Sequence, residues 1–205
     1  MACSARKPER PDFSCVLLAG GRSQRMGRDK AFLPFQGGPL WRRQWDLLKS
    51  LDPAGIWIAA PPHPAWKECA RLDDTVADSG PLGALVSALR AVSTPRVLML
   101  AVDMPNMRAD FLRRMIDHGG CTIPATEGHA EPLCAVYPKS ALALAEGLLA
   151  QRNLSLQHFV AMLRSRGLAR TWAVSPSDHH LFHNVNSPAD WLPFSSTPAS
   201  PQPSH

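Results

Sequence analysis

Short apolar runs alternate with longer stretches of helical periodicity along most of the chain. The apolar runs predict strands, because each run is short and ends at glycine, proline or a polar residue. The predicted strands cover residues 13–18, 55–60, 96–102, 121–124, 133–137 and 168–174. The periodic stretches predict helices over residues 39–51, 81–92, 109–118, 140–150 and 155–166, and a further short helix after Pro188. We expect a polar loop around Glu127 to join the fourth and fifth strands.

The run Val-Leu-Met-Leu-Ala-Val over residues 97–102 is apolar at every position. A strand of this kind is covered on both faces, as the strands of parallel sheets are. Together with the alternation of strands and helices, this run predicts an α/β fold with three layers and a mostly parallel open sheet of Rossmann-like type. Such sheets bind ligands beyond the carboxyl ends of their strands, so residues that follow a strand are the first candidates for a functional site.

The length of 205 residues suits a single domain, which we expect to cover residues 13–194. Residues 1–12 are polar and charged and include Pro8 and Pro11. Residues 195–205 are rich in serine and proline. Both end segments have the composition of disordered chain, so we expect residues 1–12 and 195–205 to be disordered.

The net charge of +5 is spread along the chain, without aromatic residues interleaved among the basic ones. This pattern favours anionic small molecules over nucleic acid as partners. No apolar run reaches the roughly 18 residues that span a bilayer, and the first residues contain no apolar signal core, so we expect a cytoplasmic protein without a membrane partner. The five cysteines form no Cys-x-x-Cys pair, which favours free thiols in a reducing compartment.

The first predicted strand ends in Gly20 and Gly21, and three arginines, a serine and Lys30 follow within a few residues. Glycine backbone lets a phosphate approach closely, and Arg25 and Lys30 could neutralise its charge. The segment lacks the Gly-Lys-Ser/Thr of a P-loop and the spacing of the G-x-G-x-x-G dinucleotide fingerprint. It therefore indicates a different phosphate-binding loop, and the alternative is a glycine turn beside a solvated basic loop.

Asp103 follows the fully apolar strand directly, so its carboxylate is expected at the carboxyl edge of the sheet. Mg²⁺ takes one or two carboxylates together with substrate phosphates and water. Asp103 is therefore a candidate metal ligand. The alternatives are a helix N-cap or a turn aspartate before Met104 and Pro105.

Asp78 precedes the segment Ser-Gly-Pro-Leu-Gly over residues 79–83, a tight turn that leads into a predicted helix. The carboxylate and the turn amides could hold a ribose or read the edge of a base. The same residues are also an ordinary signal for the start of a helix, because proline suits the first helical turn. The local sequence leaves both interpretations open.

Asn184 and Asn186 alternate near the end of the predicted domain. On a strand, residues two apart face the same side, so the two amides could hydrogen-bond a polar heterocycle together. A turn or cap before Pro188 is the alternative. The nearby Asp178, with three histidines at 179, 180 and 183, favours a surface loop over a structural metal site, because no second Cys/His set accompanies it.

In combination, these segments resemble the molybdenum cofactor guanylyltransferases, a family of nucleotidyltransferases with a Rossmann-like α/β fold. The family's opening pattern L-A-G-G-x-S-x-R-M-G-x-x-K is matched at every fixed position by residues 18–30. Four shorter patterns follow in the family's order: G-P-L at 80–82, D-x-P at 103–105, P-L-x-A-x-Y at 132–137 and N-V-N-S-P at 184–188. The resemblance covers roughly residues 13 to 192, and the first motif is the most specific.

The resemblance implies roles for individual residues. It assigns nucleotide and cofactor contacts to Leu18, Ala19, Gly20, Gly21, Lys30, Asp78, Gly80, Pro81, Leu82, Asn184 and Asn186. Within this set, the residues at 18–20 line the guanine and ribose, and the asparagines lie near molybdopterin. Arg25, Lys30 and Asp103 are the implied catalytic residues, and Asp103 is the implied Mg²⁺ ligand. One departure is that Ala59 stands where the family often has an asparagine that contacts the nucleotide.

The implied activity is Mg²⁺-dependent transfer of GMP from GTP to the terminal phosphate of molybdopterin, with release of pyrophosphate. Gly21 favours GTP, because the related cytidylyltransferases usually have alanine there. The implied partners are GTP, molybdopterin, and molybdoenzymes or their chaperones, and the implied state is a monomer or weak homo-oligomer. The alternatives are a molybdopterin cytidylyltransferase, an enzyme that acts on another acceptor such as a sugar phosphate, and a non-catalytic nucleotide-binding regulator.

Overall fold

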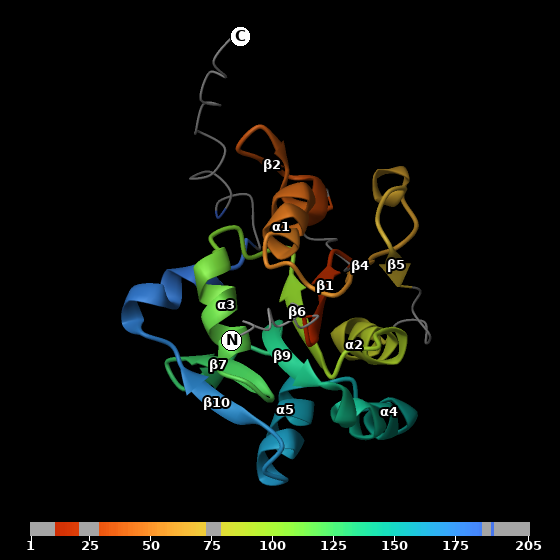
Figure 1. The fold of residues 1–205 in the computed structure, drawn as a ribbon, viewed down its shortest axis with the longest axis vertical. Helices are drawn as coiled ribbons and strands as arrows, with labels where there is room; N and C mark the ends of the chain where they lie inside the picture. Colours follow the sequence, from red (N-terminus) through yellow and green to blue (C-terminus); the bar gives the residue numbers. More distant parts are fainter. Residues whose placement is uncertain (1–10, 21–28, 73–78, 186–189, 191–205) are drawn as a thin grey trace, which may run out of the picture.

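A mixed sheet of eight strands forms the centre of the protein in the computed structural model, which describes residues 11–20, 29–72, 79–185 and 190. The strand order is β10-β7-β9-β6-β1-β4-β5 (Figure 1). Strand β8 pairs with β7 beside this path. The strands are β1 (Phe13–Leu18), β4 (Ile56–Ala59), β5 (Arg71–Leu72), β6 (Arg96–Ala101), β7 (Thr122–Thr126), β8 (His129–Ala130), β9 (Cys134–Pro138) and β10 (Arg170–Ala173). The six longest correspond to the six strands predicted from the sequence.

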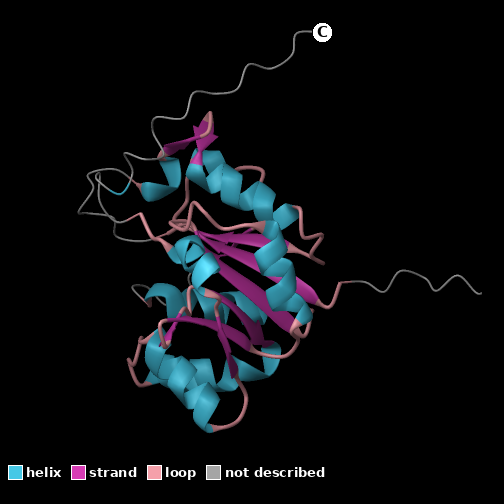
Figure 2. Cartoon of the chain, turned by 90° about the vertical axis from the view of Figure 1, so that its left-hand side faces the viewer, coloured by secondary structure: helices cyan, strands magenta, loops and turns pink. Residues whose placement is uncertain are grey.

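Helices cover both faces of the sheet, so the predicted three-layer arrangement is confirmed (Figure 2). On one face lie α1 (Leu40–Lys49) and α3 (Ala109–Asp117). On the other lie α2 (Gly80–Ala91), α4 (Leu142–Ala150) and α5 (Leu156–Ser165). Among the described residues, no helix combines the length and apolar character that a membrane span requires.

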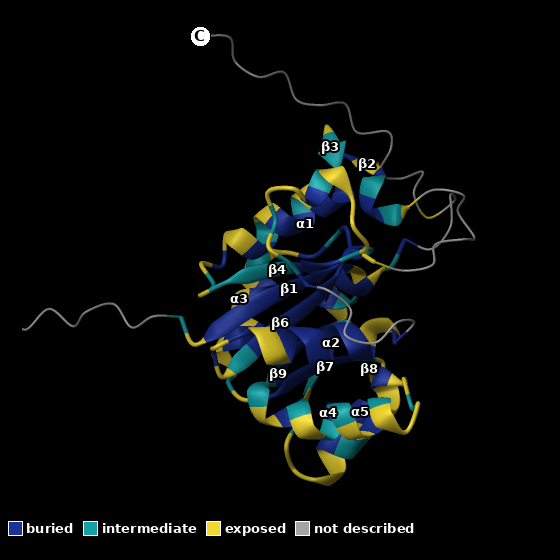
Figure 3. Cartoon of the chain, turned by 90° about the vertical axis from the view of Figure 1, so that its right-hand side faces the viewer, coloured by how far each residue is buried: buried dark blue, intermediate teal, exposed yellow. Residues whose placement is uncertain are grey.

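Strand β1 supplies side chains to both layers of the core. Cys15 and Leu17 pack on the side of α1 and α3, whereas Val16 and Leu18 pack on the side of α2. All six residues of β1 are buried, and the central strands are correspondingly dark blue in Figure 3. Burial also raises the pKa of the Cys15 thiol, so this thiol stays protonated and unreactive at neutral pH.

The sheet is mostly parallel, as predicted, because β1 pairs in parallel with β4 and β6, and β10 with β7. Strand β9 lies between β6 and β7 and runs antiparallel to both. A chain that turns back after β7 has no room for the long crossover that parallel pairing needs. Strands β1, β4, β6, β7 and β10 therefore all end at the same edge of the sheet.

The expected polar loop around Glu127 is corrected to a tight hairpin, because His129 and Ala130 form β8 against β7. Its two turn residues, Glu127 and Gly128, have φ values of 50° and 82°. Two residues in the left-handed region are typical of a hairpin turn that matches the twist of its strands. A second hairpin, β2 (Pro34–Phe35) with β3 (Gly38–Pro39), precedes α1 and was not predicted.

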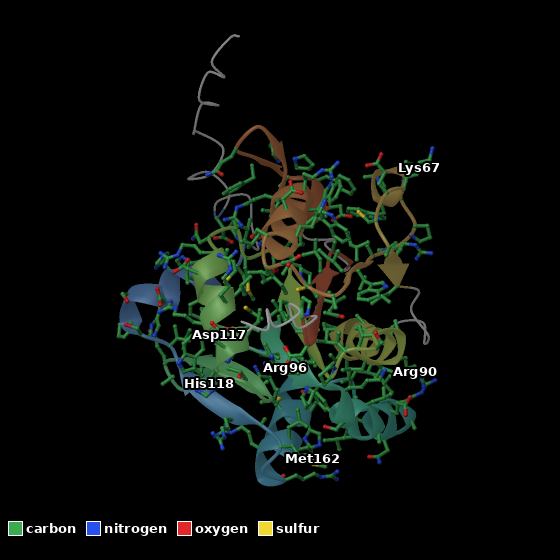
Figure 4. The ribbon with its side chains drawn as sticks, in the orientation of Figure 1. Lys67, Arg90, Arg96, Asp117, His118 and Met162 are labelled. Atoms are coloured by element: carbon green, nitrogen blue, oxygen red, sulfur yellow. The ribbon has the colours of Figure 1, made fainter. Side chains whose placement is uncertain are left out.

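The edge of the sheet at the starts of β1 and β6 is closed by ion pairs and a buried hydroxyl pair. Arg96, at the start of β6, pairs with Asp12 at 2.6 Å and donates to the carbonyl of Ile116 (Figure 4). Ser14 and Thr94 share a hydrogen bond of 2.8 Å between their hydroxyl oxygens. These contacts stabilise the edge opposite to the one at which the candidate site lies.

Candidate functional site

Three strand ends converge at the carboxyl edge of the sheet. The amides of Ala19 and Gly20, directly after β1, both donate to the carbonyl of Ala59 at the end of β4, each at 3.0 Å. The amide of Val102, directly after β6, donates to the carbonyl of Leu18 at 2.9 Å. The structure therefore brings the three residues expected to line the nucleotide next to the segment that carries Asp103.

Gly20 is exposed and lies tightly against the chain that follows β4. A Cβ at this position would be 3.2 Å from the Pro61 side chain and 3.3 Å from Cα of Ala60. The close approach of two backbones gives Gly20 a packing reason to be glycine, beside any role toward a phosphate. Leu18 and Ala19 are buried, so mainly their backbone groups remain available to a ligand.

Lys30 and Asp103 form an ion pair at this edge, with 3.3 Å between Lys30 Nζ and Asp103 Oδ2. Their side chains are 17% and 19% exposed, so water reaches the pair only in part. Lys30 begins the short helix η2 (Lys30–Phe32), whose N-cap is Asp29. The sequence predicted both residues as site residues, but not this direct contact between positions 73 residues apart.

The second carboxylate oxygen of Asp103, Oδ1, is buried and has no hydrogen-bond partner among the described residues. Leaving a buried polar atom unpaired costs about 1–3 kcal/mol, so such an atom calls for an explanation. Asp103 caps no helix, because the next helix, α3, has Arg108 at its N-cap position. An oxygen free to bind a cation, beside a lysine that can turn to a phosphate, fits a metal-dependent phosphate site.

The segment over residues 183–185 lies beside Asp103 at the carboxyl edge of the sheet. Residues 183–185 form no strand, so the described part of this segment gives no support to a strand, and Asn186 lies outside the described residues. The Val185 amide instead donates to the Asp103 carbonyl at 2.9 Å. The neighbouring Asn184 has a buried Oδ1 that no described residue hydrogen-bonds. Asn184 is thus brought next to Asp103 along the backbone.

The predicted Gly80-Pro81-Leu82 turn forms the first turn of α2. Gly80 has a φ of +58°, a conformation that favours glycine, and Pro81 is exposed beside it. Leu82 is fully buried in the core, so only its backbone could take the expected part in binding. Ser79, before the turn, has a buried hydroxyl without a hydrogen-bond partner in the described part of the chain.

Replacing Gly83 by alanine is expected to lower the free energy of unfolding by about 1–3 kcal/mol, the usual cost of overpacking. A Cβ on Gly83 would lie 1.6 Å from Ser79 Oγ and 2.4 Å from Ser79 Cβ, so the residue before the turn must move. Urea denaturation measures the effect. The matched control is Gly147→Ala in α4, where no atom lies within 4 Å and alanine should stabilise the helix by about 1 kcal/mol. A stabilised Gly83→Ala variant would contradict this account of the turn.

Four of the predicted site residues, Gly21, Arg25, Asp78 and Asn186, lie outside the described residues. Ala59, which stands in place of the expected asparagine, is buried and uses its carbonyl to hold the amides that follow β1.

Asp178, beside the histidines, is a partner for arginines. Its carboxylate lies 2.8 Å from Arg114 Nη2 and 3.7 Å from Arg108 Nη2. No group of three or more histidine, cysteine, aspartate or glutamate side chains in the described ranges is arranged to hold a metal ion.

An aromatic cluster supports the short helix that carries Lys30, and the sequence analysis did not single it out. The ring centroid of Phe32 lies 4.4 Å from that of His63 and 5.2 Å from that of Trp66, and Trp66 contacts Trp41 at 4.9 Å. The Trp66 indole donates to the carbonyl of Pro61 at 2.9 Å, which ties the cluster to the chain after β4. The rings come from three segments that are separate in the sequence, around residues 32, 41 and 63–66, so no local pattern could reveal the cluster.

The mostly parallel sheet, with Gly20, Lys30 and Asp103 at its carboxyl edge, has the arrangement expected from the resemblance to the nucleotidyltransferases. The pattern of the MobA-like NTP transferase domain matches residues 15–166. The chain therefore belongs to the family of MobA-like NTP transferases, and the resemblance stated from the sequence is confirmed.

Two relatives illustrate the similarity in sequence. A protein of Opitutus terrae named "Probable molybdenum cofactor guanylyltransferase" is 36% identical over 85% of this chain and 91% of its own length. The "Molybdenum cofactor guanylyltransferase" of Xanthomonas euvesicatoria pv. vesicatoria is 32% identical over 89% of this chain and 94% of its own. The match therefore extends over nearly the whole of both proteins.

Solved structures confirm the fold. A nucleotidyl transferase from Methanothermobacter has a TM-score of 0.73, with 20% identity over 88% of this chain and 94% of that one. Molybdopterin-guanine dinucleotide biosynthesis protein A from Archaeoglobus fulgidus has a TM-score of 0.71, with 21% identity over 88% and 95%. At this level of identity the likeness concerns the arrangement of the elements.

Proposed function

We propose that the protein transfers GMP from GTP to the terminal phosphate of molybdopterin, releasing pyrophosphate. The names of the relatives support this proposal. The observation that carries it is the pairing of Lys30 with Asp103 at the carboxyl edge of the sheet, with one oxygen of Asp103 left unpaired. The products follow from attack of the terminal phosphate on the α-phosphorus of GTP. We expect the reaction to take place in the cytoplasm and its product to pass to molybdoenzymes or their chaperones.

Asp103 is the residue that would hold Mg²⁺, because its buried Oδ1 is unpaired and a carboxylate oxygen is a ligand that this ion prefers. Bound there, Mg²⁺ would supply positive charge against the triphosphate and the departing pyrophosphate. Asn184 adds a second buried oxygen without a described partner in the adjoining segment. The donor atoms are therefore of the kind that suits a hard cation.

The proposed reaction also requires that two anions, GTP and the phosphate of the acceptor, lie close together at this site. A phosphate monoester has its second pKa near about 6, so the acceptor is largely dianionic at neutral pH and needs no strong general base. Lys30 holds a positive charge where water has only partial access, so its attraction for a phosphate is screened less than on an open surface. Lys30 pairs with Asp103, and in the proposed reaction its ammonium group also binds the triphosphate of GTP.

Pyrophosphate release, measured with each of the four ribonucleotides and with molybdopterin or sugar phosphates as acceptors, tests the proposal. We expect release with GTP and molybdopterin. Preference for CTP would indicate a molybdopterin cytidylyltransferase, and release with a sugar phosphate alone would indicate another acceptor. A protein that binds GTP but releases no pyrophosphate with any acceptor would be a regulator, and the proposal would be wrong.

Gly21→Ala is expected to shift the preference from GTP toward CTP by about tenfold, the scale of discrimination that one methyl group gives. The expectation comes from the L-A-G-G pattern at the end of the first strand. Competition between GTP and CTP measures the ratio of the two kcat/KM values. Gly147→Ala, in a helix remote from the sheet edge, is the control and should leave the ratio unchanged. An unaltered ratio in Gly21→Ala would remove this residue from base selection.

A further inference from the structure

The connection that carries Asp103 is held from several directions at once. The side-chain amide of Gln44 donates from Nε2 to the carbonyl of Met104 at 2.6 Å and lies 3.5 Å from the carbonyl of Val102. The carbonyl between these two belongs to Asp103 and accepts from the amide of Val185 at 2.9 Å. Three consecutive carbonyl groups around the candidate metal ligand are thus hydrogen-bonded by groups remote in sequence.

Gln44 is an unusual residue at its position in α1. Its neighbours on the buried face of this helix are Trp41, Trp45 and Leu48, and Gln44 itself is 0% exposed. Burying an amide is unfavourable unless its hydrogen bonds are made, and here the carbonyls after β6 accept them. A leucine or methionine would fill the same space without that requirement, so the amide has a role beyond packing.

Arg43 extends the same contact to the end of the connection. Its Nη1 donates to Oε1 of Gln44 at 2.7 Å, which fixes the orientation of the amide. Its Nη2 donates to the carbonyl of Met107 at 2.8 Å. The guanidinium also lies over the ring of Phe35, 5.3 Å from the centroid, so the hairpin before α1 steadies it. Consecutive residues of α1 therefore hold the connection over residues 102–107.

We propose that Gln44, oriented by Arg43, is a positioning residue that sets where the Asp103 carboxylate points. Because the backbone on both sides of Asp103 is fixed to α1, the carboxylate keeps one oxygen toward Lys30 and the other without a hydrogen-bond partner among the described residues. This role rests on the proposed function, since it gives the fixed carboxylate its use in holding Mg²⁺ against GTP. Displacing a catalytic group by about 1 Å can cost about 100-fold in rate, so a loosened connection has a measurable effect.

Gln44→Met tests the proposal, because methionine has a similar volume and no donor. Calorimetry measures the dissociation constant of GTP in Mg²⁺ and in EDTA. For the native protein we expect tighter binding in Mg²⁺. For Gln44→Met we expect the dissociation constant in EDTA to stay within about threefold of the native value, because the nucleotide contacts remain. Most of the increase in GTP affinity that Mg²⁺ gives the native protein should be lost, because the Asp103 carboxylate is no longer held in place. In Mg²⁺ the kcat should fall by about 10- to 100-fold, and KM for GTP should rise together with the weaker binding of GTP.

Hydrogen exchange supplies a readout that does not depend on activity. Amides over residues 104–108 should exchange at least about tenfold faster in Gln44→Met, while those of β1 keep their native rates. Arg43→Met, at a residue only partly buried, is the second variant and should show the same changes to a smaller degree. It keeps the test informative if Gln44→Met does not fold.

Ser14→Ala is the matched control, because it removes a buried hydrogen bond to Thr94 at the opposite edge of the sheet. Ser14→Ala should lower Tm. It should leave unchanged both the increase in GTP affinity that Mg²⁺ gives and the hydrogen exchange of the amides over residues 104–108. If both variants at α1 behave like Ser14→Ala, the positioning role is overturned. If the native protein transfers no nucleotide, the proposed function is overturned instead, and the two failures are distinguishable.

Discussion

Replacing Asp103 by alanine is expected to reduce guanylyl transfer by about a thousandfold and to leave the chain folded. The carboxylate is the described group best placed to hold a cation, since one of its oxygens pairs with Lys30 and the other is buried without a hydrogen-bond partner in the described part of the chain. Its loss removes the charge that would hold Mg²⁺ at the triphosphate. The fold should persist, because the backbone of this connection is held by Gln44 and Val185, whose contacts go to carbonyl groups.

Pyrophosphate release with GTP and molybdopterin measures this effect, and thermal unfolding monitors the fold. Asp103→Asn separates charge from shape and should be nearly as inactive. Asp110→Ala is the control, because it removes an exposed carboxylate at the start of α3 whose ion-pair partner, among the described residues, is the exposed Arg108. Native rates in Asp103→Ala would show that the cation is held elsewhere.

Replacing Lys30 by alanine is expected to raise the dissociation constant of GTP by about 5- to 150-fold, which corresponds to about 1–3 kcal/mol. The Lys30 side chain is only 17% exposed, and it lies at the edge of the sheet where the chain leaves β1 at Gly20. A charged hydrogen bond to phosphate in such a place is stronger than one on an open surface. Turnover should fall as well, without the near-complete loss expected for Asp103→Ala.

Lys30→Arg should restore most of the affinity, since it keeps the charge. Lys67→Ala is the control, because Lys67 is an exposed lysine on the chain that follows β4 and its removal changes net charge equally (Figure 4). Calorimetric titration with GTP measures all three variants. Equal affinities for GTP in Lys30→Ala and Lys67→Ala would show that Lys30 contributes only the nonspecific electrostatic attraction of any surface lysine.

The elements that the sequence predicted correctly are those with a strong local signal. β1 and β6 are apolar at almost every position because they are buried on both faces, and this pattern is visible without any partner. The two-residue strands β2, β3 and β5 carry no such signal, because pairing with a neighbour defines them. The reversal of β9 is set by the turn at Glu127 and Gly128, a short glycine-containing turn that could have indicated a hairpin.

For the candidate site, topology explains what could be foreseen. Residues after parallel strands share one edge, so Gly20 and Asp103 were expected there, and their neighbourhood follows from the hydrogen bonds between β1, β4 and β6. The contact of Lys30 with Asp103 depends on how η2 packs against the aromatic cluster. This packing joins residues far apart in the sequence, so no local pattern predicts it. For Asn184 the sequence left a strand and a turn open, because alternation alone cannot show whether a partner strand exists.

The placement of the candidate residues along the chain has a consequence for how this protein can change. Those that the structure describes come from residues 18–103 and from Asn184, whereas β7, β9, β10, α4 and α5 supply none of them among the described residues. The intervening half completes the sheet and covers it. Substitutions in these elements are therefore expected to change thermal tolerance or surface charge more than phosphate chemistry.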